Sequence, residues 1–289
     1  MITRIFWLAS THARLCLILG LAAGLLLPGF AATLVPWLPH MVAALLTTTA
    51  LRIGHQAAMG AMRDLRWGLG SVAVLQMIVP LFLLGVLTLA GLQDTPAALV
   101  IVLTSAAPAI TGSVNLALMM RLDGGRMMQI LVLGTAAFPL TVLPVLMLMP
   151  QLGPADQVVL AALKLLGVII LAAGAGFTLR AWLFAQPTDG QIKALDGLSV
   201  LAFSFIVVGL MAALNPALRS DPLTVALWAL LAFAISYLLQ LFTLLTLRRT
   251  LLRPVAGPLA IGAGNRNIAI FLVALPPDIL TPLMIFIGC

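Results

Sequence analysis

Two short stretches of this chain share a pattern, Gly112-Ser113-Val114-Asn115-Leu116-Ala117-Leu118 and Gly264-Asn265-Arg266-Asn267-Ile268-Ala269-Ile270. The first glycine, the asparagine three residues later and the alanine two residues after that coincide, and the residues around the alanine are aliphatic in both. The stretches lie in the fourth and the ninth of a series of apolar segments, so they cross a membrane in opposite directions. A motif that recurs five helices later in the opposite direction is what an inverted-topology duplication leaves. Chance similarity between apolar segments of low complexity is the alternative.

The composition makes this chain an integral membrane protein. Of its 289 residues, 63% are hydrophobic and 8% are charged, and the mean hydropathy is +1.20. Soluble domains carry about 25% charged residues, so a soluble enzyme and a disordered chain are excluded. The acidic residues are all Asp, and the 15 basic residues form no patch interleaved with aromatic residues, which argues against a nucleic-acid partner. The expected partner is the lipid bilayer.

Ten apolar segments follow one another along the chain. A helix needs about 20 apolar residues to span the hydrocarbon, and these runs are continuously apolar rather than alternating, which indicates helices and not a barrel. The predicted spans are residues 13–29, 31–51, 67–91, 97–120, 127–149, 157–181, 195–215, 222–246, 254–274 and 277–289. The last segment is short for a complete crossing. The sequence thus predicts an all-α polytopic membrane protein with a single membrane domain over residues 1–289.

The basic residues favour one side of this predicted topology. With the N-terminus in the cytoplasm, the outer side receives only Arg219. The inner side receives Arg4, Arg14, Arg52, Arg63, Arg66, Arg121, Arg126, Arg180, Lys193, Arg248, Arg249 and Arg253. Because Lys and Arg concentrate in the cytoplasmic loops of membrane proteins, this bias predicts a cytoplasmic N-terminus. The membrane expected for the chain is a bacterial-type inner membrane.

Both matching stretches contain residues that interrupt a membrane helix. In the fourth predicted span, Pro108 lacks a backbone donor and Gly112 loosens the next turn. In the ninth, Gly264 precedes two asparagines that flank Arg266. Interrupted backbone at membrane depth survives where it is buried in protein or lines a wet cavity, and paired interruptions point to a transporter's binding site. Close helix packing is the simpler explanation for the glycines, but it does not account for Arg266.

Several short motifs, in order and spacing, resemble the bile acid:sodium symporter family of the bile acid, arsenite and auxin carrier superfamily. The motifs extend over nearly the whole chain. They are Leu27-Pro28-Gly29, Ala50-Leu51-Arg52-Ile53-Gly54, Gln76 with Pro80, Ala107-Pro108 through Asn115, Arg121-Leu122-Asp123-Gly124, Pro139-Leu140-Thr141 and Gly264-Asn265-Arg266-Asn267. The resemblance implies two inverted five-helix repeats, about residues 1–150 and 151–289. It also implies broken, crossing fourth and ninth helices beside a panel of the first, second, sixth and seventh, and transport by alternating access.

The resemblance places the substrate and ion sites at this crossing. The candidate substrate-binding residues are Arg266, Asn265, Asn267, Asn115, Ser113 and Thr111. The candidate ligands of a retained sodium ion are Gln76, Ser113, Asn115, Gly262 and Asn267. In sodium-coupled relatives, a Glu and a Gln that help to bind sodium stand where this chain has Gly262 and Arg266. The loss of one negative charge and the gain of a positive one predict altered or lost sodium coupling, with Arg266 in place of a mobile cation.

We expect Arg266 to have a function, because a charged side chain at membrane depth costs about 2.5–3.5 kcal/mol on insertion scales and is rarely kept without one. Two roles remain open, and one does not exclude the other. The guanidinium can pair with the carboxylate or phosphate of an anionic substrate, or it can cap backbone carbonyls freed at the crossing. Ser236, Tyr237 and Gln240 in the eighth predicted span either line the same cavity or hydrogen-bond between helices.

The leading hypothesis is a secondary transporter of a small organic anion. The alternatives are sodium-coupled symport of a bile acid-like anion through neutral oxygens, and a membrane binding or sensor protein without transport. An enzyme is not expected, because the spans show no paired carboxylates, no His and Glu metal cluster and no nucleophile beside a base. No cofactor is predicted apart from sodium. Neither the identity of the substrate nor the oligomeric state follows from the sequence.

Overall fold

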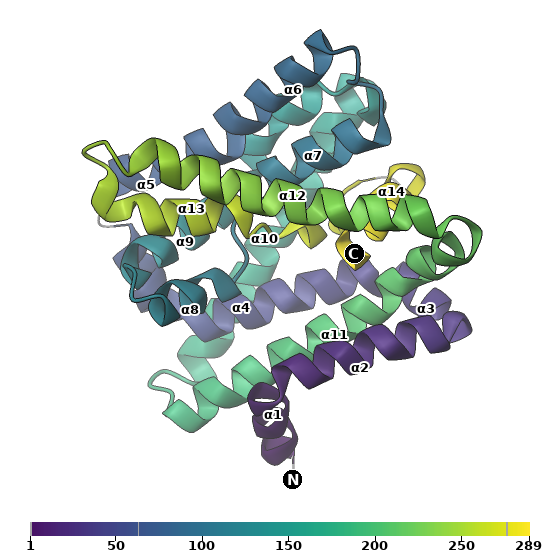
Figure 1. The fold of residues 1–289 in the computed structure, drawn as a ribbon. Helices are drawn as coiled ribbons and strands as arrows, with labels where there is room; N and C mark the ends of the chain where they lie inside the picture. Colours follow the sequence, from purple (N-terminus) through teal and green to yellow (C-terminus); the bar gives the residue numbers. More distant parts are fainter. Residues whose placement is uncertain (1, 63, 276) are drawn as a thin grey trace. The chain divides into compact units, whose positions relative to one another are not determined.

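The computed structural model describes residues 2–62, 64–275 and 277–289, and the regular elements in these ranges are all helices (Figure 1). The α-helices are α1 (Ile2–Thr11), α2 (Ala13–Leu26), α3 (Pro28–Leu34), α4 (Leu38–Ala61), α5 (Leu65–Ala73), α6 (Val79–Leu89), α7 (Pro96–Ala106), α8 (Gly112–Met119), α9 (Gly124–Met147), α10 (Ala155–Leu183), α11 (Asp189–Ser220), α12 (Pro222–Leu247), α13 (Ala256–Gly264) and α14 (Pro277–Gly288). The short 3₁₀ segments are η1 (Val35–Trp37), η3 (Pro150–Leu152), η4 (Arg253–Val255) and η5 (Ile268–Val273), and η2 (Val74–Ile78) is a π-helical turn. The predicted all-α class is confirmed.

Six helices in the described ranges are long and apolar enough to cross a membrane. They are Pro28–Ala61, Leu65–Leu89, Gly124–Met147, Ala155–Leu183, Asp189–Ser220 and Pro222–Leu247. The bent pair Arg4–Thr11 and Ala13–Leu26 makes a seventh if it is one span. The predicted fourth, ninth and tenth spans do not reach this length, because α7, α13 and α14 have 11, 9 and 12 residues. The chain is therefore an all-helical membrane protein, whereas the count of ten spans is not confirmed.

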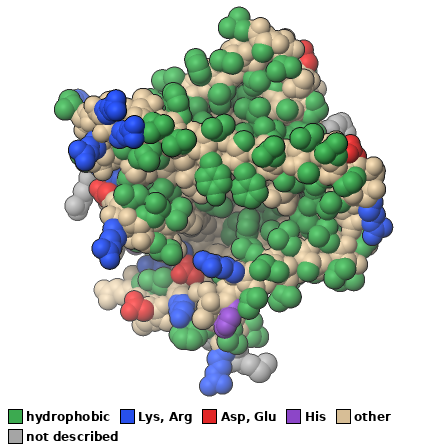
Figure 2. Space-filling view, viewed as in Figure 1, with side chains coloured by type: hydrophobic (Ala, Val, Ile, Leu, Met, Phe, Trp, Pro, Cys, Tyr) green, Lys and Arg blue, Asp and Glu red, His purple; other side chains and the backbone are tan. Residues whose placement is uncertain are grey.

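The surface of α12 is suited to lipid. Only 11% of its most apolar 18-residue stretch is buried, and Phe233, Leu238 and Phe242 are each more than half exposed. Hydrophobic side chains predominate along α12 in Figure 2, and basic side chains gather where α12 leads into α13. An apolar surface of this extent on a soluble monomer would be a large exposed patch, whereas on a membrane helix it is the face that lipid covers.

The chain divides into two compact units. The first consists of Met1–Ala57, Gly167–Ala229 and Phe271–Cys289, and the second of Ala58–Leu166 and Leu230–Ile270. In the first unit, α11 packs against α1, α2, α3 and α14. Close approach depends on Gly197, since a Cβ there would overlap the backbone of Phe6. The last helix therefore belongs to the same unit as the N-terminal helices and α11. The helices α2 and α11 of this unit correspond to predicted spans for which the resemblance implies a panel.

The second unit contains the matching stretches of the sequence. Its longest helical run is α5, η2 and α6, which continue into one another from Leu65 to Leu89. This run packs against α9, where the Gln129 Nε2 donates to the carbonyl of Asp64 at 2.7 Å. Arg126 forms an ion pair with Asp64 at 2.8 Å and lies over the Trp67 ring. The hydrogen bond from Arg126 holds the pKa of the Asp64 carboxyl below its usual value. These contacts anchor the start of α5 beside α9.

Candidate functional site

Two interruptions of the helical backbone lie against each other within the second unit. The helix α7 ends at Ala106 and α8 begins at Gly112, while α13 ends at Gly264 and η5 begins at Ile268. The intervening segments pair as an isolated antiparallel bridge between Ala109 and Arg266. The amide of Ile110 donates to the Asn265 carbonyl at 3.0 Å, and the amide of Asn267 donates to the Pro108 carbonyl at 2.7 Å. We call residues 107–111 and 265–267 together the break pair.

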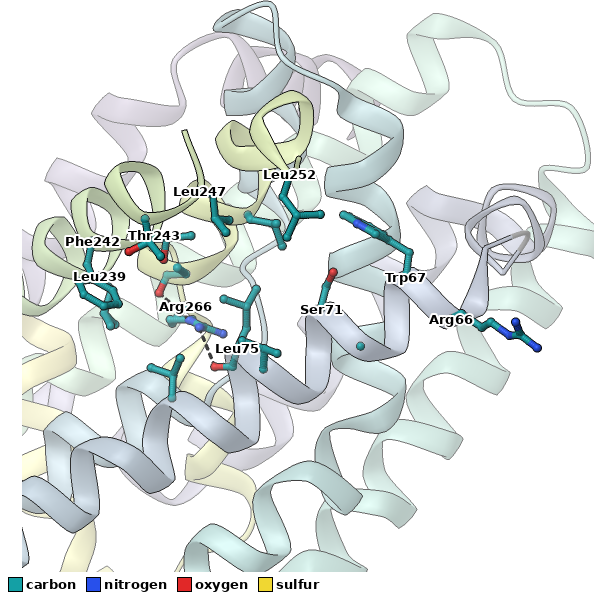
Figure 3. Close-up of a pocket in the computed structure, with 16 residues that line it drawn as sticks. Arg66, Trp67, Ser71, Leu75, Leu239, Phe242, Thr243, Leu247, Leu252 and Arg266 are labelled. Atoms are coloured by element: carbon teal, nitrogen blue, oxygen red, sulfur yellow. Dashed lines mark hydrogen bonds between the residues drawn. The ribbon is translucent and has the colours of Figure 1, made fainter. Parts of the chain in front are cut away.

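Arg266 binds three backbone carbonyls at the break pair and is only 8% exposed. Its Nε donates to the carbonyl of Ala263 at 2.8 Å, its Nη1 to that of Ala107 at 2.8 Å, and its Nη2 to that of Leu75 at 3.0 Å. Figure 3 shows the guanidinium directed toward the backbone of Leu75. The side chain thus joins the ends of two broken helices to the run of α5, η2 and α6.

Each of these carbonyls lacks its usual helical partner for a local reason. The amide of Asn267, four residues after Ala263, donates to Pro108 instead. Ala107 has ψ of 150°, so its carbonyl points out of the helix that it ends. In the π turn the amide of Val79 donates to Val74, and the next residue, Pro80, has no N–H to give to Leu75. Arg266 therefore satisfies carbonyls that the backbone itself leaves unpaired.

The predicted site residues take different places around the break pair. The amide of Gln76 is buried, and its Oε1 accepts from the Thr141 Oγ1 at 3.1 Å. The Asn265 Nδ2 donates to the Ile261 carbonyl at 3.0 Å and so caps the end of α13. Asn115 on α8 and Asn267 are at least partly accessible, as is Thr111. The Ser113 Oγ is buried and has no hydrogen-bond partner among the described residues.

Gly262 and Gly264 have unlike surroundings. A Cβ at Gly262 would lie 3.2 Å from Cγ2 of Ile130 and 3.5 Å from Cε of Met127, so this face of α13 meets an apolar wall of α9. The position where the resemblance places a Glu therefore faces aliphatic and thioether groups. At Gly264, a Cβ would overlap the Ser236 carbonyl and the Gln240 side chain on α12. Gly264 thus permits close contact between α13 and α12.

Polar residues of α12 hold the end of α13. The Ser236 Oγ donates to the Gly264 carbonyl at 2.9 Å, and the Gln240 Nε2 donates to the Ser236 Oγ at 3.3 Å. Tyr237 lies on another face of α12 and is 63% exposed. Of the two roles that the sequence left open, Ser236 therefore takes the interhelical one, while Gln240 donates to Ser236 within α12.

A cavity of about 370 Å³ opens beside Arg266, between the α5, η2 and α6 run on one side and α12 and α13 on the other. Its lining is mostly aliphatic and aromatic and includes Trp67, Leu75 and Phe242. Arg66 also borders it, but in Figure 3 the Arg66 side chain points away from the other labelled residues. This cavity was not predicted from the sequence, in which the unexplained Arg266 was the one signal for it.

No carboxylate accompanies Arg266 in the part of the second unit that the structure describes. Asp64, Asp94, Asp123 and Asp156 are all exposed near helix ends. The partners of Arg266 are neutral carbonyls, so its positive charge has no counter-ion from the described residues. The described residues also contain no group of three His, Cys, Asp or Glu side chains arranged to hold a metal ion.

Neither a scan against protein-family models nor a search of the curated proteins finds a match to this chain. The resemblance to the bile acid:sodium symporter family therefore stays a prediction from the motifs quoted above.

Proposed function

We propose that this protein is a secondary transporter of a small organic anion that works by alternating access around the break pair. One observation carries the proposal: a buried arginine holds the ends of two interrupted helices in a membrane protein and has no carboxylate partner among the described residues. Interrupted backbone at membrane depth is tolerated where it is buried in protein or lines a water-filled cavity, and an intramembrane charge marks function by default. Ten helices, the inverted repeats and a cytoplasmic N-terminus in a bacterial inner membrane belong to the same proposal.

The proposal gives Arg266 the place of a coupling cation. Three carbonyl oxygens at 2.8–3.0 Å surround its guanidinium, as oxygen ligands would surround a mobile ion. A sodium ion about 4 Å from this charge would be repelled by roughly 4 kcal/mol at an effective dielectric of 20. Without a carboxylate to offset that repulsion, sodium binding beside Arg266 is unfavourable. Transport is therefore proposed to proceed without sodium.

Uptake into proteoliposomes tests this function. The full chain is reconstituted, and the initial uptake of labelled cholate, pantoate, indole-3-acetate and octanoate is measured with an inward gradient of sodium or of choline. We expect protein-dependent uptake of at least one acid, at the same rate with either cation. Uptake that needs sodium would contradict the assignment of Arg266, and uptake of none of these acids would favour a binding or sensor protein.

Sodium-coupled symport is the second candidate, and the unpartnered Ser113 Oγ favours it. A buried hydroxyl without a partner costs about 1–3 kcal/mol, which a bound sodium ion would offset. Under the leading proposal, Ser113→Ala leaves the unfolding temperature unchanged or raises it, in sodium or in choline, because it removes an unsatisfied group. Under the second candidate, sodium stabilises the parent protein and Ser113→Ala abolishes this stabilisation. Thermal unfolding of both proteins in the two salts separates these results.

A further inference from the structure

The cavity beside Arg266 has the properties of a binding site for a single small ligand. Its volume of about 370 Å³ is near the lower end of the range of roughly 300–1,000 Å³ that is usual for small-molecule sites. Apolar side chains of α5, η2, α12 and α13 form most of its wall, and Ser71, Thr243 and Thr246 add hydroxyl groups. All of the residues that line the cavity belong to the second unit, so the cavity lies within one compact body.

Arg266 supplies the charge of this cavity and has donors to spare. A guanidinium carries five N–H groups, and three of them are used for the carbonyls of Ala263, Ala107 and Leu75. One N–H on Nη1 and one on Nη2 therefore have no acceptor among the described residues. A buried cation with free donors and no counter-ion, on the wall of an apolar cavity, is complementary to an anion.

We infer that the cavity binds a small monovalent carboxylate with an unbranched apolar chain. The carboxylate accepts from the free N–H groups of Arg266, and the chain lies between the α5 and α12 walls. A second charge on the ligand would lie unpaired among aliphatic side chains, which is unfavourable. This inference rests on the proposed function, because it takes Arg266 as the counter-ion of the transported class of anion.

Two glycines of the same helical run allow a matched test. Gly70 lines the cavity, whereas Gly85, fifteen residues further along, does not. Both are exposed, and a Cβ at either position would meet no atom within 4 Å. Gly70→Phe therefore adds a large side chain to the cavity wall, and Gly85→Phe adds the same side chain away from the cavity. Thr243→Phe fills the cavity from the α12 wall and serves as a second variant if Gly70→Phe fails to fold.

Binding is measured on the full chain in sodium-free lipid nanodiscs with octanoate as the probe. The readouts are the unfolding temperature and the quenching of tryptophan fluorescence by 2-bromooctanoate, because Trp67 lines the cavity. We expect octanoate to stabilise the parent protein and 1-octanol and octylammonium to stabilise it much less. Because the added ring should exclude about two methylenes of the ligand from the apolar site, Gly70→Phe should weaken octanoate binding by at least about tenfold. Gly85→Phe should bind as the parent does.

Several results would overturn the inference. Octanoate binding that is equal in Gly70→Phe and Gly85→Phe, or equal stabilisation by 1-octanol, excludes the cavity as the site. Absence of octanoate binding to the parent protein does the same. Uptake of organic acids by the same preparations separates the two proposals. Uptake that survives Gly70→Phe refutes the cavity and leaves transport standing, whereas cavity-dependent octanoate binding without any uptake supports the cavity and refutes transport.

Discussion

Replacing Arg266 with methionine is expected to lower the free energy of unfolding by about 3 kcal/mol. The variant leaves the carbonyls of Ala263, Ala107 and Leu75 without a donor, and each such loss costs about 1–3 kcal/mol, or roughly 6 kcal/mol for the three. Removal of a charge from membrane depth returns about 2.5–3.5 kcal/mol. The difference between these two values is the expected net loss of unfolding free energy. Thermal or denaturant unfolding in detergent, monitored by the circular dichroism of the helices, measures it directly.

Arg266→Lys is the matched control for this result. The ammonium keeps the charge and offers three donors, but as a compact group it does not reach three separate carbonyls as the guanidinium fork does. It should therefore be less destabilising than Arg266→Met but should not restore the parent stability. An Arg266→Met variant as stable as the parent would show that the break pair does not depend on this side chain.

Arg266→Gln separates the two roles of the guanidinium. If Arg266 contacts the organic anion, the affinity for a transported or bound acid falls at least about tenfold, as expected for loss of a charged hydrogen bond. If affinity is intact while stability falls, Arg266 only joins backbone segments and the proposed anion contact is wrong.

Replacing Gly264 with alanine is expected to destabilise the protein by about 3 kcal/mol, at the upper end of the usual cost of overpacking. The new Cβ would overlap the Ser236 carbonyl and lie 2.6 Å from the Gln240 Nε2. A backbone carbonyl cannot move aside as the end of a flexible side chain can. The α13 and α12 helices must separate, which also breaks the hydrogen bond from the Ser236 Oγ to the Gly264 carbonyl. The unfolding temperature measures the loss.

Gly112→Ala is the natural control because Gly112 stands at the matching place in the first of the two similar stretches. A Cβ at Gly112 would meet no atom within 4 Å, so this variant should keep the stability of the parent or gain a few tenths of a kcal/mol in helix propensity. Equal destabilisation by both variants would show that the glycines serve a shared backbone conformation rather than the contact with α12.

The helical class and the positions of both interruptions were predictable from local chemistry. Continuous apolar runs require internally paired backbone in a membrane, which helices provide. Pro108 lacks an N–H, and the glycines and asparagines before and after Arg266 disfavour a continuous helix. These properties belong to residues close together in the chain, so they can be inferred without knowing any distant contact. The count of ten spans was less predictable, because interruption shortens a helix by an amount that the pattern does not reveal.

The role of each candidate residue required the tertiary structure. In the sequence, Gly262 and Gly264 stand two residues apart in the ninth predicted span, but one faces Ile130 and the other faces Ser236. The sequence offered Gln76 as a candidate ion ligand, and only the structure shows that its Oε1 accepts from Thr141, 65 residues away. The cavity could not be predicted from the sequence, because its walls come from segments separated by more than 150 residues.

Arg266 shows where the two sources of information meet. The sequence alone determined that this residue is out of place, since it is the one basic residue between two asparagines in an apolar segment. Only the tertiary structure decided what it binds, because the carbonyls of Leu75 and Ala107 are 191 and 159 residues away along the chain. The cost of burying a charge is a property of the residue and its segment, whereas the groups that offset this cost are brought near by packing of the whole unit.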